Sequence, residues 1–277
     1  PGFNLRIAKW AREQGLKVIF YISPQVWAWK EGRVKMMKEC IDKMLVILPF
    51  EKDYFKNKWN WDVEYVGHPL VEVIEAKQAE IPATPFTSKP IIALLPGSRK
   101  QEILKKLPIM LALSPKFPDH QFIVAKAPGL EESFYDELMK DYNNVSYVSN
   151  QTYSLLEQSA AALVTSGTAT LETALFGVPE VVCYKGSAIS YEIARRVIKV
   201  KYISLVNLIM DKLVVKELIQ HELTVENLYR ELKELLENKT RQAELKKDYS
   251  DLKKILGEGG HASQKAALSI VNYLQGK

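Results

Sequence analysis

The sequence contains little cysteine. Cys40 and Cys183 are the only two cysteines among 277 residues, and neither belongs to a Cys-x-x-Cys or Cys/His pattern. Two isolated thiols exclude a disulfide-stapled secreted domain and predict a reducing compartment, the cytoplasm. A chain of this length buries a large core, so its folding needs neither a disulfide nor a structural metal.

Long hydrophobic runs and strong charge are also lacking. The longest apolar stretches, such as residues 44–50, are far shorter than the roughly 18 residues that a membrane-spanning helix needs. The net charge of +5 and the pI of about 8.9 amount to a mild basic bias. This bias suits a small anionic ligand or a membrane surface, and it is too weak to indicate nucleic acid.

Several signatures of nucleotide and metal chemistry are missing. The sequence has no G-x-x-x-x-G-K-[ST], no G-x-G-x-x-G, no H-E-x-x-H and no Asp-x-Asp pair to hold a divalent ion on a sugar nucleotide. The four histidines are widely spaced. His68 follows an expected strand as either a cleft residue or an ordinary loop histidine. We expect no metal and no cofactor.

Short apolar runs alternate with amphipathic stretches along most of the chain. Residues 17–22, 43–50 and 63–67 predict strands, and residues 4–14, 30–42 and 51–58 predict helices. Residues 75–90, with three prolines, predict a linker. Strands are then expected at "PIIALLP", "QFIVAK", "VSYV", "AALVTS", "EVVCYK" and "YISLV". From about residue 211 to the end, the spacing of Lys, Glu and Leu predicts helices.

Continuous β-branched runs are typical of a parallel sheet that is covered on both faces. We therefore expect an α/β protein with two Rossmann-like, doubly wound domains. Residues 1–78 are expected to form the first domain, and residues 79–277 the second, which also carries the terminal helices. Ligands of such folds bind at the carboxyl ends of the strands, so a cleft between the domains is the expected site.

The stretch "LLPGSRKQE" (94–102) lies where that rule places a ligand. Gly97 allows a sharp turn after the strand, and Ser98 is expected to cap the following helix, with Glu102 completing a capping box. Arg99 adds a planar cation suited to phosphate oxygens, next to a helix start that favours anions. The alternative is a plain strand-to-helix turn with a solvated arginine.

A second turn of this kind occurs in "LVTSGTATLETALFGVP" (163–179). Ser166, Gly167 and Thr168 open a helix after a strand, which suits a phosphate. Glu172, just over one turn later, would repel a phosphate but can accept hydrogen bonds from ribose hydroxyls. The alternative for Glu172 is an exposed helix residue without a ligand.

Two further stretches have open interpretations. In "YISPQVWAWKEGRV" (21–34), Ser23, Gln25, Trp27 and Trp29 follow a strand; the tryptophans either line a ligand cleft or pack on the core. The basic run 195–201 is either a solvated helix face or a surface that attracts phosphate or anionic lipid.

Six stretches occur together in one order: "FYISPQVWAWKEGRV", "ILPFEKDYF", "YVGHPL", "LLPGSRKQEI", "TSGTATLETALFGVP" and "SLVNLI". In this arrangement the chain resembles the lipid-A-disaccharide synthase family, from Pro1 to about Leu218. The resemblance implies a GT-B glycosyltransferase that moves 2,3-diacylglucosamine from UDP-2,3-diacylglucosamine to 2,3-diacylglucosamine 1-phosphate. The products are the β-1,6-linked lipid A disaccharide 1-phosphate and UDP, formed with inversion and without a metal. It also implies peripheral association with the cytoplasmic membrane surface of a Gram-negative cell, and a homodimer.

The resemblance also implies roles for particular residues. Arg99 stabilises the leaving group, Glu172 binds the ribose, and Asn207 lies near the donor. Donor-binding positions are expected at Gly97, Ser98, Ser166, Gly167 and Thr168, and cleft positions at Ser23, Gln25, Trp27 and His68. Glu180 stands where glutamine or an apolar residue is expected, and the sequence offers no reason for it.

Residues 1–5 read like the middle of a protein. The family carries an acidic residue shortly before the "PGFN" stretch, a candidate base for the acceptor 6-hydroxyl. We therefore expect that the N-terminus and this base are missing from the chain as given. The alternatives are another GT-B enzyme that uses a UDP-sugar, such as an epimerase, and an inactive UDP-binding fragment.

Overall fold

The computed structural model describes residues 2–80, 84–187, 200–258 and 260–276. These residues form two compact units. The first consists mainly of the residues up to Val73 together with those from Lys253 onward, and the second lies mainly between Ile74 and Leu252. Each unit has its own parallel sheet. Most of the basic run 195–201 lies outside the described residues.

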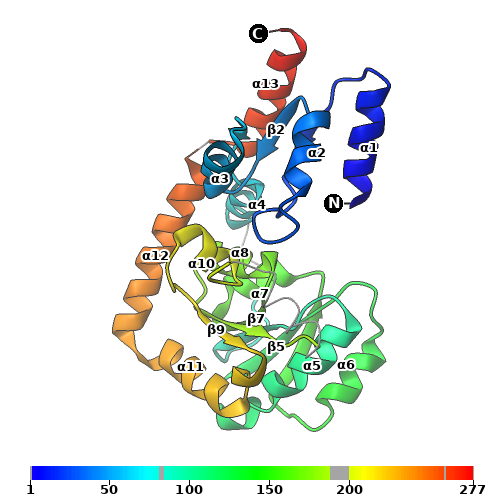
Figure 1. Cartoon of the computed structure of the whole chain (residues 1–277). Coiled ribbons are helices and arrows are strands. Elements are labelled where there is room, and N and C mark those ends of the chain that lie inside the picture. Colours follow the sequence, from blue (N-terminus) through cyan, green and yellow to red (C-terminus); the bar gives the residue numbers. More distant parts are fainter. Residues whose placement is uncertain (1, 81–83, 188–199, 259, 277) are drawn as a thin grey trace. The chain divides into compact units, whose positions relative to one another are not determined.

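The first unit is built on a three-stranded parallel sheet in the order β1-β2-β3 (Figure 1). Its elements are α1 (Gly2–Glu13), β1 (Ile19–Tyr21), α2 (Arg33–Cys40), β2 (Lys43–Val46), α3 (Pro49–Trp59), β3 (Glu64–Tyr65), the first part of α4 (Pro69–Gln78) and α13 (Ala262–Leu274). Val34, Met37 and Phe55 are fully buried in its core. These strands and the helices α1, α2 and α3 confirm the expected element types.

The sequence did not predict helix α4, because the helix extends into the start of the expected linker. Pro69 fixes a helical φ at the first position, where no amide donor is needed. Val71 and Ile74 then bury one side of the helix. The prolines at 82, 85 and 90 biased the prediction toward a linker beginning at residue 75, and the helix continues to Gln78.

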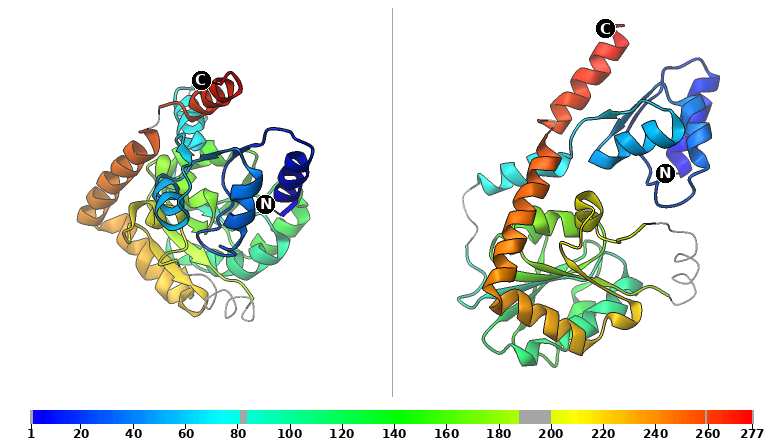
Figure 2. Two further views of the ribbon diagram at one scale, coloured as in Figure 1. Left: turned by 45° about the horizontal axis from the view of Figure 1, so that its top comes forward. Right: turned by 60° about the vertical axis from the view of Figure 1, so that its left-hand side comes forward.

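The second unit, which runs from cyan to orange in Figures 1 and 2, contains a parallel sheet. The sheet has six strands in the order β6-β5-β4-β7-β8-β9. Its strands are β4 (Ile91–Leu95), β5 (Gln121–Lys126), β6 (Val145–Ser149), β7 (Ser159–Thr165), β8 (Glu180–Tyr184) and β9 (Lys216–Ile219). Its helices are α5 (Lys100–Leu111), η1 (Ser114–Lys116), α6 (Glu132–Met139), α7 (Thr152–Glu157), α8 (Thr168–Leu175), α10 (Leu205–Met210), η2 (Gln220–Glu222), α11 (Val225–Glu237) and α12 (Lys239–Gly257).

Helices cover both faces of this sheet, which is why its central strands read as continuous apolar runs. All five residues of β4 are buried. Ile91, Ala93 and Leu95 pack toward α7 and the start of α8. Helix α11 contacts β7, β8 and β9 and also packs on α5. The α/β class with parallel sheets is thus confirmed.

The chain changes direction within this sheet. From β4 it proceeds through β5 to β6 at one edge, and β7 then returns to pair with the other side of β4. The β4–β7 pair is therefore the topological switch point. In open α/β sheets, the loops after two such strands diverge and leave a crevice at their carboxyl ends.

The expected strand at "YISLV" is wrong. Ser204 caps a helix there: its hydroxyl accepts a hydrogen bond from the Asn207 amide, and α10 begins at Leu205. The sixth strand is β9, inside the region expected to be only helical. Two of the four residues of β9, Lys216 and Glu217, are charged, and this concealed the strand. The strand at "VSYV" forms, but at the sheet edge and only partly buried.

Glu180 begins β8 and is 1% exposed. Neither carboxylate oxygen has a hydrogen-bond partner among the described residues. Burial raises the pKa of Glu180 well above its ordinary value, and Cys183 and Tyr249 lie close enough to interact with it electrostatically. The residue that the sequence could not explain is thus an unpaired, buried acid.

We predict that Glu180→Met stabilises the protein at neutral pH by about 1–3 kcal/mol, the usual cost of an unsatisfied buried polar group. Because the folded pKa is raised, the stability linked to this proton is present below the unfolded pKa and is lost as pH rises. The gain should therefore be larger at pH 8 than at pH 4.5 in urea denaturation. Glu180→Gln should remove the pH-dependent part alone. Equal unfolding curves for all three proteins at both pH values would contradict this account.

Candidate functional site

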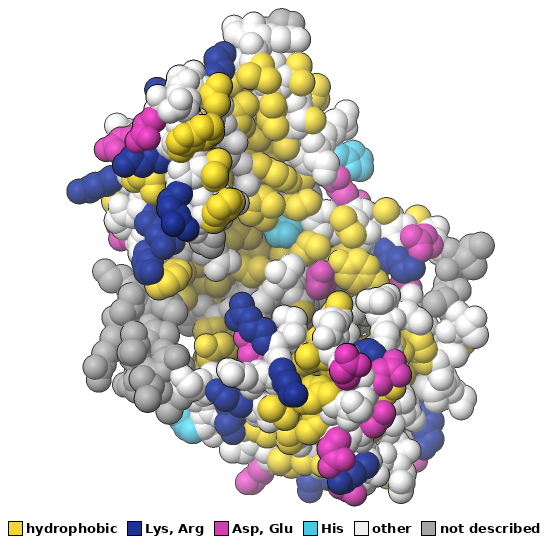
Figure 3. Space-filling model, turned by 90° about the vertical axis from the view of Figure 1, so that its right-hand side faces the viewer, with side chains coloured by type: hydrophobic (Ala, Val, Ile, Leu, Met, Phe, Trp, Pro, Cys, Tyr) yellow, Lys and Arg dark blue, Asp and Glu magenta, His cyan; other side chains and the backbone are white. Residues whose placement is uncertain are grey.

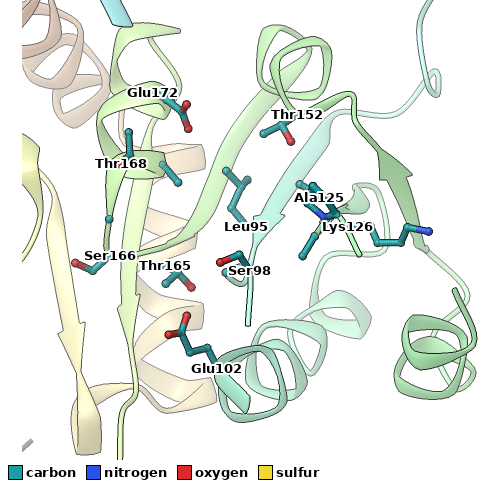
Figure 4. A pocket seen from close by; sticks show the side chains of 15 residues that line it. Leu95, Ser98, Glu102, Ala125, Lys126, Thr152, Thr165, Ser166, Thr168 and Glu172 are labelled. Carbon is teal, nitrogen blue, oxygen red and sulfur yellow. The ribbon is translucent and has the colours of Figure 1, made fainter. Parts of the chain in front are cut away.

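A pocket of about 310 Å³ lies at the switch point of the six-stranded sheet. We call it the switch-point pocket. It is lined by the ends of β4, β5 and β7, by Thr152 at the start of α7, and by the residues that follow the three strands: Leu95, Gly97, Ser98, Glu102, Ala125, Lys126, Ala127, Pro128, Thr165, Ser166, Gly167, Thr168, Ala169 and Glu172 (Figure 4). The two turns singled out in the sequence thus meet in one pocket.

Gly97 is at the close approach between these two turns. Its φ of +111° is a backbone conformation that residues with a Cβ rarely adopt. A Cβ at this position would lie 3.2 Å from Glu102 Oε2, 3.5 Å from Lys106 Nζ and 3.6 Å from Thr165 Cγ2. Glycine is therefore required by both the backbone angle and the space beside it.

The expected cap at Ser98 is wrong by one residue. Helix α5 begins at Lys100, so Arg99 is its N-cap, and no side chain caps it. The carboxylate of Glu102 instead pairs with Arg99, at 3.1 Å between Nη1 and Oε1. The Arg99 side chain is 81% exposed and does not line the switch-point pocket in this structure. Ser98 does line it, beside Thr165 (Figure 4).

The second turn forms as expected. Gly167 is the N-cap of α8 with a φ of +149°, and no atom lies within 4 Å of the Cβ that another residue would place there. The Thr170 hydroxyl donates to the Gly167 carbonyl at 2.8 Å and fixes the turn. The first amides of a helix lack partners within it. The start of α8 therefore presents amide donors to the pocket.

The side chain of Ser166 does not take part in this cradle. Its hydroxyl donates to the Ile203 carbonyl at 2.8 Å, and it points away from the other pocket side chains (Figure 4). The one proton of this hydroxyl is therefore used in a hydrogen bond within the protein. Ser166 offers the pocket its main chain and ties the α8 turn to the loop before α10.

Glu172 lies on the pocket side of α8. Its Oε1 accepts a hydrogen bond of 2.8 Å from the Tyr153 hydroxyl. Burial and this contact together raise the pKa of Tyr153, which therefore stays a donor at physiological pH. Tyr153 orients the carboxylate by holding one oxygen of Glu172, and the other oxygen has no hydrogen bond among the described residues. Nothing in the sequence pattern drew attention to Tyr153.

Asn207 does not reach the switch-point pocket, contrary to expectation. It is fully buried. Its Oδ1 accepts from the amides of Val214 and Val215, at 2.8 and 2.9 Å, and its Nδ2 donates to Glu217 Oε1 at 2.9 Å. The same Glu217 oxygen accepts from the amides of Ile203 and Ser204, at 3.1 and 2.9 Å. Asn207 and Glu217 therefore hold the loop that Ser166 bonds to.

A second pocket lies in the first unit, at the carboxyl end of β1. We call it the β1 pocket. It has a volume of about 610 Å³ and is lined by Asn4, Phe20, Tyr21, Ile22, Ser23, Pro24, Gln25 and Trp29. Ile22 has a φ of +68°, which is strained for a β-branched residue and occurs mainly where function or packing demands it.

The two tryptophans of this region differ. Trp29 lines the β1 pocket and is 48% exposed. Trp27 does not line it: its ring packs edge-on against Phe50, and its Nε1 donates to Glu51 at 3.1 Å. Burial raises the pKa of Glu51 to about 7. Trp27 therefore takes the packing role that the sequence left open as the alternative.

His68 is buried and belongs to the local fold. Its Nδ1 accepts from the Leu70 amide at 3.2 Å, at the start of α4, and its own amide donates to the Leu256 carbonyl. Burial lowers its pKa to about 4, so it is neutral at physiological pH. His68 lines neither of the two pockets described above.

The described residues contain neither a metal-binding cluster nor a membrane-spanning helix. No three His, Cys, Asp or Glu side chains in that part of the chain are grouped so as to hold a metal ion. No helix there is long and apolar enough to span a bilayer.

The model of the family described as lipid-A-disaccharide synthetase matches residues 1–271. The chain belongs to the lipid-A-disaccharide synthase family. The lipid-A-disaccharide synthase of Syntrophus aciditrophicus is 38% identical over 98% of this chain and 73% of that protein. Lipid-A-disaccharide synthase 1 of Legionella pneumophila strain Lens is 40% identical over 80% of this chain and 60% of that protein.

Solved structures support the fold of this lipid-A-disaccharide synthase family member. A UDP-GlcNAc 2-epimerase from Neisseria meningitidis, bound to UDP-GlcNAc, aligns with a TM-score of 0.61 and 15% identity, covering 99% of this chain and 73% of that one. The calicheamicin glycosyltransferase CalG4 aligns with a TM-score of 0.56 and 15% identity, covering 99% and 73%. The expected GT-B fold is thus confirmed.

We predict that Glu217→Gln lowers the free energy of unfolding by about 1–3 kcal/mol, because an amide NH₂ would replace one oxygen that accepts buried amides. Chemical denaturation measures this change. Glu226→Gln, at an exposed position in α11, is the matched control and should change stability by less than about 0.5 kcal/mol. Equal stability of the two variants would contradict the role given to Glu217.

Proposed function

We propose that this chain transfers 2,3-diacylglucosamine from UDP-2,3-diacylglucosamine to 2,3-diacylglucosamine 1-phosphate, giving lipid A disaccharide 1-phosphate and UDP. The observation that carries the proposal is the meeting of the Gly97 turn and the start of α8 in one pocket of a family member. Two solved neighbours, the Neisseria epimerase and HepE of Anabaena, contain a UDP-sugar, and HepE aligns with a TM-score of 0.55.

The donor UDP would lie in the switch-point pocket. The acceptor 6-hydroxyl attacks the anomeric carbon and releases its proton to solvent, the bond from that carbon to the diphosphate oxygen breaks, and negative charge grows on the departing diphosphate. Amides at Gly167 and Thr168, with the α8 dipole, stabilise that charge. The proposed step uses no metal and no cofactor, and we assign no base.

Arg99 would supply a cation to the same diphosphate. Its present partner, Glu102, is an exposed i,i+3 contact, and such pairs hold their side chains weakly. A bound diphosphate can therefore draw the guanidinium away from Glu102. Glu172 would accept hydrogen bonds from the ribose hydroxyls through the oxygen that Tyr153 leaves available. Asn207 would act indirectly, because it holds the loop that accepts a hydrogen bond from Ser166.

The acceptor would bind the first unit, in the expected domain 1–78. The β1 pocket, with Ser23 and Gln25 beside apolar walls, supports this assignment. Peripheral association with the cytoplasmic membrane surface is proposed as well. Helix α1 exposes Phe3, Ile7 and Trp10, at 68%, 48% and 55%, and Figure 3 shows apolar side chains beside Lys and Arg on one face of the molecule. A homodimer stays a prediction.

We predict that this chain binds UDP in calorimetry and forms disaccharide from UDP-2,3-diacylglucosamine and 2,3-diacylglucosamine 1-phosphate. Binding without turnover would favour the alternative of an inactive UDP-binding fragment. Formation of a different sugar product would favour another UDP-sugar enzyme, such as an epimerase. Absence of UDP binding would contradict all three.

We predict that Arg99→Ala lowers kcat by at least about 100-fold, the typical effect of losing one group that stabilises transition-state charge. Thermal unfolding should be unchanged, because the side chain is exposed. Arg230→Ala, at another exposed arginine, is the control and should retain activity. Wild-type turnover by a folded Arg99→Ala protein would refute the role of Arg99.

A further inference from the structure

Lys106, on α5, is the one buried lysine or arginine in the described part of the chain, at 2% exposed. Lysine is almost never fully buried unless it is paired, because its ammonium loses hydration. Among the described residues Lys106 has no hydrogen bond and no ion pair, and the titratable neighbours that act on its ammonium are Glu102, Cys183 and Lys105. Burial accordingly lowers the pKa of Lys106. A buried ammonium without a partner calls for an explanation.

The ammonium lies directly behind the Gly97 turn. The Cβ that another residue would place at Gly97 stands 3.5 Å from Lys106 Nζ and 3.6 Å from Thr165 Cγ2. Gly97 and Thr165 both line the switch-point pocket. The missing side chain of Gly97 therefore leaves the space through which Lys106 can act on a ligand in that pocket.

A second unpartnered polar group lies at the same place. The Thr165 hydroxyl, at the carboxyl end of β7, is buried and has no hydrogen-bond partner among the described residues. An ammonium and a hydroxyl can both donate to one anionic oxygen. Two donors that lie around one glycine turn and have no hydrogen-bond partner there are available to one phosphate oxygen.

Glu102 acts on Lys106 electrostatically without forming an ion pair with it. It lies near enough to raise the pKa of the ammonium, but its Oε1 is engaged by Arg99 at 3.1 Å. Glu102 therefore stands between the two cations and keeps both near the pocket before a ligand arrives. A bound diphosphate would replace Glu102 as the negative charge beside Lys106 and Arg99.

We propose that Lys106 is a second cation of the donor diphosphate site, reaching a phosphate oxygen past Gly97 from the inside while Arg99 approaches from the solvent side. This inference rests on the proposed function, because it assigns the ligand of the same pocket. Lys106 binds the ground-state diphosphate as well as the departing one, since it is already in place. Its loss weakens nucleotide binding, whereas loss of Arg99 acts mainly on turnover.

The test compares Lys106→Met with Lys105→Met, an exposed lysine one residue earlier on the same helix. Calorimetry measures the Kd of each protein for UDP and for uridine, which lacks the phosphates. Lys106→Met should weaken UDP binding by about tenfold or more, as expected for a charge-assisted hydrogen bond, and leave uridine binding unchanged. Lys105→Met should bind both ligands like the wild type, and Lys106→Arg should retain most of the UDP affinity.

Methionine fills a similar volume without a buried charge, so Lys106→Met is expected to fold at least as stably as the wild type. Wild-type UDP affinity in Lys106→Met would overturn the inference and leave the proposed function intact. Equal losses for UDP and uridine would also overturn it, because they would indicate a distorted pocket. A wild-type chain that does not bind UDP would overturn both the inference and the proposed function.

Discussion

The parallel pairing of β4 with β7 is the constraint on which the site depends. Because these strands point the same way and lie side by side, the turns that follow them emerge at one edge of the sheet. Residues about 70 positions apart in the sequence, Gly97 and Gly167, are thereby brought to one pocket. Both glycines adopt positive φ angles, so both turns are tight enough to present backbone to a ligand. Loss of this pairing would separate the two halves of the site.

In the proposed function, the site would meet the negative charge of the diphosphate with groups of different mobility. The amides at the start of α8 are fixed by the fold and cannot reorganise during the reaction. Arg99 is exposed and held by one weak ion pair, whereas Lys106 is buried and held in place by packing. Fixed donors suit the bound diphosphate, and a mobile cation suits charge that appears only as the bond breaks. Asn207 and Glu217 support the loop that Ser166 bonds to, and neither side chain has a hydrogen-bond donor left for a ligand.

Much of this arrangement could be read from the sequence, since strand, turn and helix starts follow local rules. The "LLPGSR" and "TSGT" turns could be predicted because a glycine follows an apolar run in each. Lys106 and Glu217 could not be found this way, because a charged residue in a helix or short strand normally predicts a solvated surface. Asn207 was misplaced because its motif gives no sign that Val214, Val215 and Glu217 consume its hydrogen bonds. Such roles depend on contacts between segments that the one-dimensional pattern does not encode.

The central claim is that the diphosphate of UDP sits between the Gly97 turn and the start of α8. A crystal structure of this chain with UDP tests it most directly. The account predicts phosphate oxygens within hydrogen-bond distance of the amides at Gly167 and Thr168, with Lys106 Nζ directed at the same group past Gly97. A diphosphate bound elsewhere, with the α8 amides facing solvent, would contradict it.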